Sequence, residues 1–194
     1  SRFKFSKRIA AERISIKYAA KIMVSTKQEM DEQYTHPLYI STLDKFDKTK
    51  FEIISPGVNE NIFSQTPTSA DDILKPKLDT IFGVNGGPVI LVSSRLDEKK
   101  NIIGVVQAYS EDTALIEKAH LVLCFRGIKD PEADIHTLSK EEQIILRKIL
   151  NIIERSHIQK HVHFLNIGSQ LELAATYRYF AQRSSVFALT SLYE

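Results

Sequence analysis

An arginine and a lysine five residues apart, Arg95 and Lys100, have types and spacing that suggest chemistry. They follow the apolar run Pro88 to Ser93, which has the length and composition of a buried strand. Arginine offers a planar fork of N–H donors and lysine a compact charge, so the pair suits the oxygens of a diphosphate. Charged loops are common, however, and on spacing alone we favour the plainer interpretation that both side chains are solvated.

Polar residues also follow three further apolar runs, which we predict as strands over residues 120–125, 161–165 and 186–190. In an open parallel sheet, ligands bind outside the carboxyl ends of the strands. The strand ends are followed by Arg126-Gly127, by Asn166 to Ser169 and by Ser191 to Glu194. We therefore expect Ser93, Arg126, Asn166 and Glu194 near one edge of a sheet.

The histidine and cysteine residues give weaker indications of a functional site. His161 and His163 share one side of a predicted strand, but no third ligand is near in sequence, so we expect no metal site. Cys124 is the single cysteine and lies in an apolar run, which predicts a packed core thiol. One cysteine excludes an internal disulfide and a multi-cysteine zinc cluster, and favours a reducing, cytoplasmic location.

The elements that must position these residues are strands alternating with helices. The strands are short and continuously apolar, which is typical of a parallel sheet covered on both faces. Helices are predicted near 101–109, 139–155 and 169–183, and two of them begin with capping-box spacing, Ser139 with Glu142 and Ser169 with Glu172. With right-handed crossovers, this alternation predicts a Rossmann-like α/β fold.

The first part of the chain is less regular. A helix is predicted over 8–22, a strand over 21–26, a polar helix over 27–34 and a short apolar run over 51–54. Residues 60–86 resemble a linker with one helical turn, Ile73 to Leu78, capped by Asp71-Asp72. The apolar stripe of the first helix is expected to contain Ile9, Ala10, Ile14, Ala19 and Ala20.

Composition sets outer limits on function. The 194 residues are 43% hydrophobic, which is enough for one domain or pieces of two. Lysine and arginine total 26 against 24 acidic residues, and the net charge of +2 argues against a nucleic-acid or anionic-lipid partner. The apolar runs are much shorter than the roughly 20 residues of a membrane span, and the basic start lacks the apolar stretch of a signal peptide. Function must therefore come from local sites.

Several motifs together resemble the sucrose-phosphate synthase family of retaining glycosyltransferases with the two-domain GT-B fold. Ser94 to Asn101 is similar to the family's Arg-Leu-x-x-x-Lys donor loop, and Ser55 to Asn59 to the turn that enters its interdomain linker. The resemblance covers nearly the whole chain and is weakest from Ser64 to Val84. It is carried further by Arg8 to Arg13, Val24 to Glu29, Arg126 to Ile128 and Val186 to Glu194.

The resemblance implies transfer of glucose from UDP-glucose to fructose 6-phosphate with retention at the anomeric carbon. It implies that Arg95 and Lys100 hold the donor diphosphate and that Glu194 lies beside the donor sugar or its nucleotide. By the same resemblance, Ile167 would lie in a loop that faces the uracil, and Arg8, with Lys7 beside it, matches a position that approaches the acceptor phosphate. The implied partners are a nucleotide sugar and a sugar phosphate; no cofactor is implied, and no metal is expected to be essential.

The resemblance also predicts the domain organisation, a central piece of a GT-B enzyme whose remaining polypeptide lies on both sides. Residues 1–60 would end the N-terminal, acceptor-side domain, 61–86 would form the linker, and 87–194 would begin the C-terminal, nucleotide-sugar-binding domain. We expect the 194-residue chain by itself to transfer no sugar, because the reaction needs both halves of the interdomain cleft.

Two alternatives stay open. One is a related retaining enzyme with another donor or acceptor, such as sucrose synthase or mannosylfructose-phosphate synthase. The other is a non-catalytic nucleotide-binding module. A phosphorylated acceptor needs a cationic pocket and free fructose does not. Lys7 and Arg8 therefore favour an enzyme similar to sucrose-phosphate synthase over the first alternative.

Overall fold

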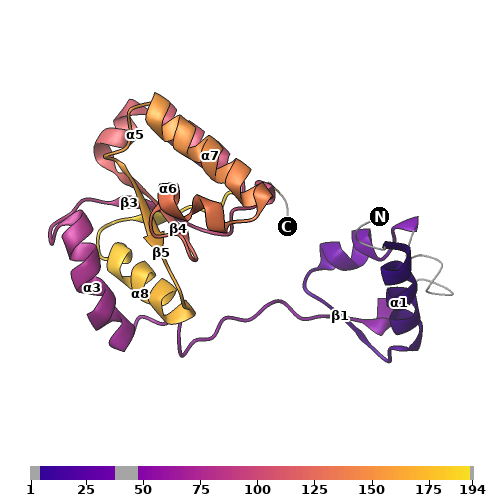
Figure 1. Cartoon of the computed structure of the whole chain (residues 1–194). Coiled ribbons are helices and arrows are strands. Elements are labelled where there is room, and N and C mark those ends of the chain that lie inside the picture. Colours follow the sequence, from indigo (N-terminus) through magenta and orange to yellow (C-terminus); the bar gives the residue numbers. More distant parts are fainter. Residues whose placement is uncertain (1–4, 38–47, 193–194) are drawn as a thin grey trace. The chain divides into compact units, whose positions relative to one another are not determined.

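The structure, a computed structural model, describes residues 5–37 and 48–192, and the chain forms two compact units, Ser1–Val58 and Asn59–Glu194 (Figure 1). The first unit contains α1 (Phe5–Tyr18), β1 (Ile22–Val24), the π-helical turn η1 (Glu29–Gln33), the 3-10 turn η2 (Lys48–Lys50) and β2 (Phe51–Ile53). The unit boundary at Val58 lies close to the predicted end of the first domain, although the roles assigned to the domains stay predictions.

The first unit is built on a parallel pair of short strands, in which Ile22 of β1 pairs with Phe51 of β2. The Lys50 ammonium donates to the carbonyls of Ile16 and Lys17 at 2.8 and 3.1 Å and so caps the end of α1. The core consists of Ile16, Ile22, Val24, Met30 and Phe51. The predicted stripe of α1 is wrong in part, because Ile14 is 62% exposed and Ile16 is the buried isoleucine.

The second unit contains a four-stranded parallel sheet in the order β5-β4-β3-β6. Its strands are β3 (Val89–Ser93), β4 (His120–Phe125), β5 (Val162–Asn166) and β6 (Val186–Phe187). Its helices are α3 (Ser69–Phe82), η3 (Glu98–Lys100), α4 (Ile102–Glu111), α5 (Thr113–Lys118), α6 (Pro131–Asp134), η4 (Ile135–Thr137), α7 (Lys140–Arg155) and α8 (Gln170–Ala181).

Helices cover both faces of this sheet, as the continuously apolar strands predict (Figure 1). Along β4, Leu121 and Leu123 pack in the cluster that contains α4 and α7 residues. The intervening residues, Val122 and Cys124, pack in the cluster that contains α3 and α8 residues. This two-residue alternation is the geometry of a strand between two layers, and the predicted α/β fold class is confirmed.

The capping boxes fix two helix starts, with one difference from expectation. Ser139 and Glu142 cap each other's backbone N–H groups at the start of α7, as predicted. At α8 the Ser169 hydroxyl accepts from the N–H of Glu172, but the Glu172 carboxylate accepts from the N–H of Gly168 at 2.7 Å. The second box is therefore shifted by one residue on the carboxylate side.

The predicted linker contains a full helix. Where the sequence suggested one helical turn, α3 extends over Ser69–Phe82 and begins at a capping box between Thr68 and Asp71. Leu78 of α3 is 2% exposed and packs against the sheet with α8 residues. Residues 69–82 are therefore part of the second unit and not a free connection.

Candidate functional site

The polar edge of the sheet lies where the strand order reverses. From β3 the chain continues outward through β4 and β5, and then β6 pairs with the other side of β3. In open α/β sheets this switch point, at the carboxyl ends of the strands, is where ligands bind. The loop after β3 and the segment after β6 meet there, and these carry Arg95, Lys100 and Ser191.

Three of the four polar strand ends share this edge, as predicted. Ser93 pairs with Cys124, two residues before Arg126, and Phe125 pairs with Asn166. The side-chain oxygen of Asn166 also accepts from the N–H of Gly127 at 2.8 Å, which joins the ends of β4 and β5. The fourth residue, Glu194, lies outside the described residues.

A cavity of about 540 Å³ lies at this edge, and we call it the strand-end cavity. Its lining includes Ser93, Arg95, Arg126 and Ile167 from the ends of three strands, together with residues at the starts of α7 and α8, among them Glu142 and Leu173. Ile167 is 9% exposed, while Arg126 is exposed at the rim. An apolar wall with exposed cationic groups suits a flat base joined to a phosphate.

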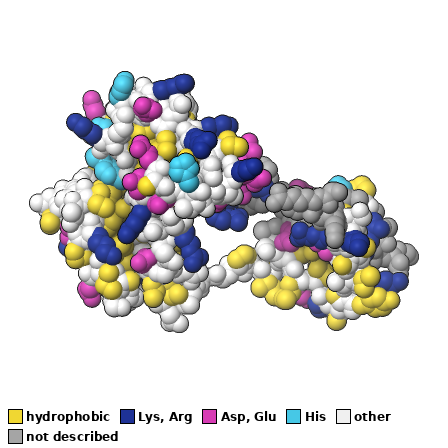
Figure 2. All heavy atoms as spheres, viewed as in Figure 1, with side chains coloured by type: hydrophobic (Ala, Val, Ile, Leu, Met, Phe, Trp, Pro, Cys, Tyr) yellow, Lys and Arg dark blue, Asp and Glu magenta, His cyan; other side chains and the backbone are white. Residues whose placement is uncertain are grey.

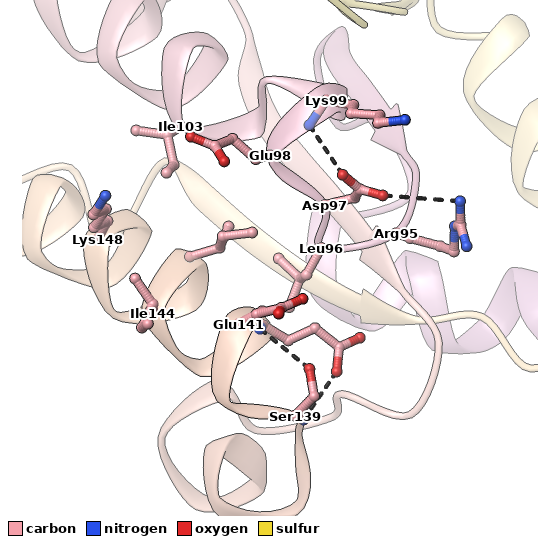
Figure 3. Close-up of a pocket in the computed structure, with 12 residues that line it drawn as sticks. Arg95, Leu96, Asp97, Glu98, Lys99, Ile103, Ser139, Glu141, Ile144 and Lys148 are labelled. Carbon is pink, nitrogen blue, oxygen red and sulfur yellow. Dashed lines mark hydrogen bonds and ion pairs between the residues drawn. The ribbon is translucent and has the colours of Figure 1, made fainter. Parts of the chain in front are cut away.

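A second cavity of about 570 Å³ adjoins the first, and we call it the loop cavity because η3 forms one wall (Figure 3). Arg95 lines both cavities, and its side chain is 83% exposed. In Figure 3 it extends away from Ile103 and Lys148, with a guanidinium nitrogen 3.9 Å from the Asp97 carboxylate. Asp97 also accepts from the N–H of Lys99 and so caps η3. Arg95 is therefore a solvated cation at the mouth of both cavities.

Lys100 lies on the β6 side of the same loop. Its ammonium donates to the Ser191 hydroxyl at 3.2 Å, and its carbonyl accepts from the Thr190 hydroxyl at 3.1 Å. The loop thus presents Arg95 beside the two cavities and Lys100 beside the segment after β6. Sequence spacing predicted both cations at this edge, but gave no signal for the contacts with residues 190 and 191.

The expected acceptor residues lie in the first unit. Lys7 and Arg8 are exposed on α1, and the Arg8 guanidinium bonds to Glu12 one turn later at 3.1 Å. This exposed i,i+4 pair contributes little to stability, so Arg8 is available to an anion at small cost. The role of both residues stays a prediction.

Other features of the described residues place limits on the site. Among residues 5–37 and 48–192, no group of three or more histidine, cysteine or acidic side chains is arranged to hold a metal ion. None of the described helices has the length and apolar content to cross a membrane. On the face seen in Figure 2, basic and acidic side chains are interspersed and not gathered by sign. The described residues on that face therefore form no broad basic patch.

No protein-family model matches the chain. A probable sucrose-phosphate synthase from Thermosipho melanesiensis is 39% identical over 193 residues, which is 100% of this chain and 39% of that protein. The predicted resemblance is confirmed. A sucrose synthase from Nitrosomonas europaea is 27% identical over 224 residues, which covers all of this chain and 28% of that protein. The chain thus spans well under half of the length of each of these two curated relatives.

Solved structures agree on the fold. A sucrose-phosphate synthase from Thermosynechococcus elongatus gives a TM-score of 0.62 at 19% identity, over 97% of this chain and 39% of that one. The catalytic domain of starch synthase IV from Arabidopsis thaliana gives 0.60 at 16% identity, over 94% and 37%. These likenesses confirm the predicted GT-B glycosyltransferase fold.

Proposed function

We propose that this chain is part of an enzyme that transfers glucose from UDP-glucose to fructose 6-phosphate with retention, and that it supplies the donor-diphosphate contacts through Arg95 and Lys100. The observation that carries the proposal is the position of both cations on the loop after β3 at the switch point, with Arg95 lining the strand-end cavity and Lys100 beside the segment after β6. The identity to a probable sucrose-phosphate synthase supports the choice of reaction.

In this proposal Arg95 and Lys100 act by electrostatic stabilisation of the leaving group. As the bond from the anomeric carbon to the diphosphate breaks, negative charge grows on the leaving oxygens, and fixed cations stabilise that charge. Ile167 and the loop after β5 would then hold the base, and Lys7 and Arg8 would approach the acceptor phosphate. Glu194 would lie beside the donor sugar. No cofactor enters this proposal, and a cytoplasmic location goes with it because soluble sugar phosphates are its substrates.

The donor contacts are tested first with UDP. We expect the chain to bind UDP weakly and with strong salt dependence, because exposed cations are screened. Replacing Arg95 or Lys100 by alanine should abolish most of this affinity in a titration followed by NMR. Arg147→Ala, which removes an exposed cation from α7, is the matched control and should change nothing. Equal affinity in all four proteins would show that the loop cations are merely solvated.

The reaction itself is tested in a chimera in which this chain replaces the matched 193 residues of the Thermosipho relative. Formation of sucrose 6-phosphate is expected, and Arg95→Ala or Lys100→Ala should cost about 2–4 kcal/mol in kcat/KM.

A second candidate is sucrose synthesis from free fructose, favoured by the likeness to sucrose synthases. Offering fructose and fructose 6-phosphate separately to the chimera decides between the two acceptors. Lys7→Ala and Arg8→Ala should impair only the reaction with the phosphorylated sugar.

A further inference from the structure

The segment after β6 is held tightly against the loop that carries Lys100. The N–H of Ala188 donates to the carbonyl of Leu91 in β3 at 2.9 Å, so the segment leaves the sheet in register with β3. Beyond it, the N–H of Leu192 donates to the carbonyl of Lys99 at 2.8 Å. Residues 188–192 thus follow first β3 and then η3, although the two segments lie about 90 positions apart in sequence.

Two hydroxyl groups in this segment form hydrogen bonds with Lys100. The Thr190 hydroxyl donates to the Lys100 carbonyl at 3.1 Å, and the Ser191 hydroxyl accepts from the Lys100 ammonium at 3.2 Å. On the other side the N–H of Lys100 donates to the carbonyl of Asp97 at 3.0 Å. Two hydrogen bonds therefore fix the backbone of Lys100, one at its carbonyl and one at its N–H, and a third holds its ammonium.

These hydrogen bonds reduce the entropy that the lysine side chain loses when it binds a phosphate. The flexible four-carbon stem loses rotamer entropy when the ammonium is fixed on a ligand, and binding must otherwise overcome that loss. A hydroxyl that accepts from the ammonium before the ligand arrives removes part of that cost. An ammonium has three N–H donors, so one bond to Ser191 is compatible with bonds to phosphate oxygens.

We propose that Thr190 and Ser191 are positioning residues that hold Lys100 in the orientation needed to bind the donor diphosphate. The proposal rests on the proposed function, because it assumes that Lys100 meets the diphosphate. Neither hydroxyl has to touch the ligand, since each acts through Lys100.

The test is the affinity for UDP measured by NMR titration of the chain. Ser191→Ala should weaken UDP binding about 3- to 10-fold, and Thr190→Val by a similar factor, because each change removes one hydrogen bond that orients Lys100. Ser191→Thr and Thr190→Ser keep the hydroxyl and should restore affinity. Ser110→Ala removes an exposed hydroxyl bond on α4 and is the matched control that should leave affinity unchanged.

A double-mutant cycle separates positioning from general damage. In the Lys100→Ala background, Ser191→Ala should have no further effect, whereas a direct contact or a loss of folding would add to the first change. An additive effect overturns the proposal, as does unchanged affinity of Ser191→Ala when Lys100→Ala binds poorly. If Lys100→Ala itself binds UDP normally, the proposed function fails instead.

Discussion

His163 lies in a stack of imidazole rings at the amino ends of β4 and β5, away from the strand-end cavity. Its Nε2 lies 2.7 Å from the Nδ1 of His120, and the two rings are stacked with centroids 5.0 Å apart. Phe82 of α3 packs edge-on against it with centroids 4.8 Å apart. Burial, together with smaller effects of the neighbouring His120 and His161, lowers the pKa of His163 to about 4. Burial therefore favours the neutral form of both His120 and His163 by lowering their pKa values.

This stack predicts how stability depends on pH. The pKa of His163 is lower in the folded chain than the ordinary 6.5, so its stabilising effect is complete above 6.5 and is lost as pH falls toward about 4. We expect the free energy of unfolding in urea to drop by on the order of 2 kcal/mol across this window. His163→Phe should flatten that slope, whereas His136→Gln, at an exposed position, should not. An unchanged slope in His163→Phe would contradict this account.

At the residue scale, the sequence predicted the positions of those side chains that lie just after the end of a strand. Arg95 and Ile167 lie at the predicted edge because each comes directly after an apolar run. The contacts of Thr190 and Ser191 with Lys100 were not predictable, because no local pattern reports a pairing across 90 positions. The histidine stack was missed for the same reason, since His120 and His163 meet only once β4 and β5 pair.

At the scale of elements, two arginines of the α8 region attach α3 to the second unit. Arg178 forms a two-pronged ion pair with Asp71, with nitrogen–oxygen distances of 2.7 and 2.6 Å, and also donates to the carbonyls of Ile62 and Ser64. Arg183 bonds to Asp79 at 3.1 Å and lies over the ring of Tyr179. The Arg178 guanidinium holds the pKa of Asp71 at about 2, which marks a strong contact.

Removing Arg178 should therefore cost more than removing an exposed ion pair. Its side chain is 11% exposed and that of Asp71 is 19% exposed. Arg178→Ala therefore leaves a mostly buried carboxylate with only its bonds from Thr68 among the described residues, and removes the donor to the carbonyls of Ile62 and Ser64. We expect a loss of about 2–4 kcal/mol in urea unfolding and faster amide exchange over residues 62–71. Lys75→Ala, at a side chain 63% exposed that pairs with Asp79, is the control and should cost under about 0.5 kcal/mol. Equal losses of unfolding free energy in both variants would show that the Arg178 contact contributes no more than an exposed ion pair.

The elements that the sequence predicted well are those with strong local signals. β4 begins and ends as expected, and α7 begins at its predicted cap, because an apolar run or a capping box lies within the element itself. α3 was underestimated because Pro76 and the surrounding polar residues resemble a connection. Its stability comes largely from partners such as Arg178 and Phe180, more than a hundred positions along the chain, which local propensity does not report.

At the scale of the whole molecule, the cores that the described residues form in the two units share no residues. The core of the first unit is made from residues 16–51, and the two clusters of the second unit are made from residues 78–180. Residues 54–58, the last residues of the first unit, have no helix or strand, and Ile54 and Val58 are 57% and 62% exposed. Composition indicated one domain or pieces of two, and the separate cores favour the second possibility.

The separate cores predict that a shortened chain beginning at Asn59 folds by itself. It keeps α3, the four-stranded sheet, both cavities, Arg95 and Lys100, so it should unfold cooperatively on heating and bind UDP as the full chain does. A second shortened chain, beginning at Gly87, lacks α3 and thus uncovers the apolar side of α8 and leaves Arg178 and Arg183 without their carboxylates. We expect this shorter form to lose the cooperative transition or to unfold several kcal/mol more easily, because a buried helix and two ion pairs are gone. Circular dichroism melting curves of the two forms decide the matter: equal curves would mean that residues 69–82 are the linker that the sequence first suggested, and unfolding of both would mean that the second unit depends on the first.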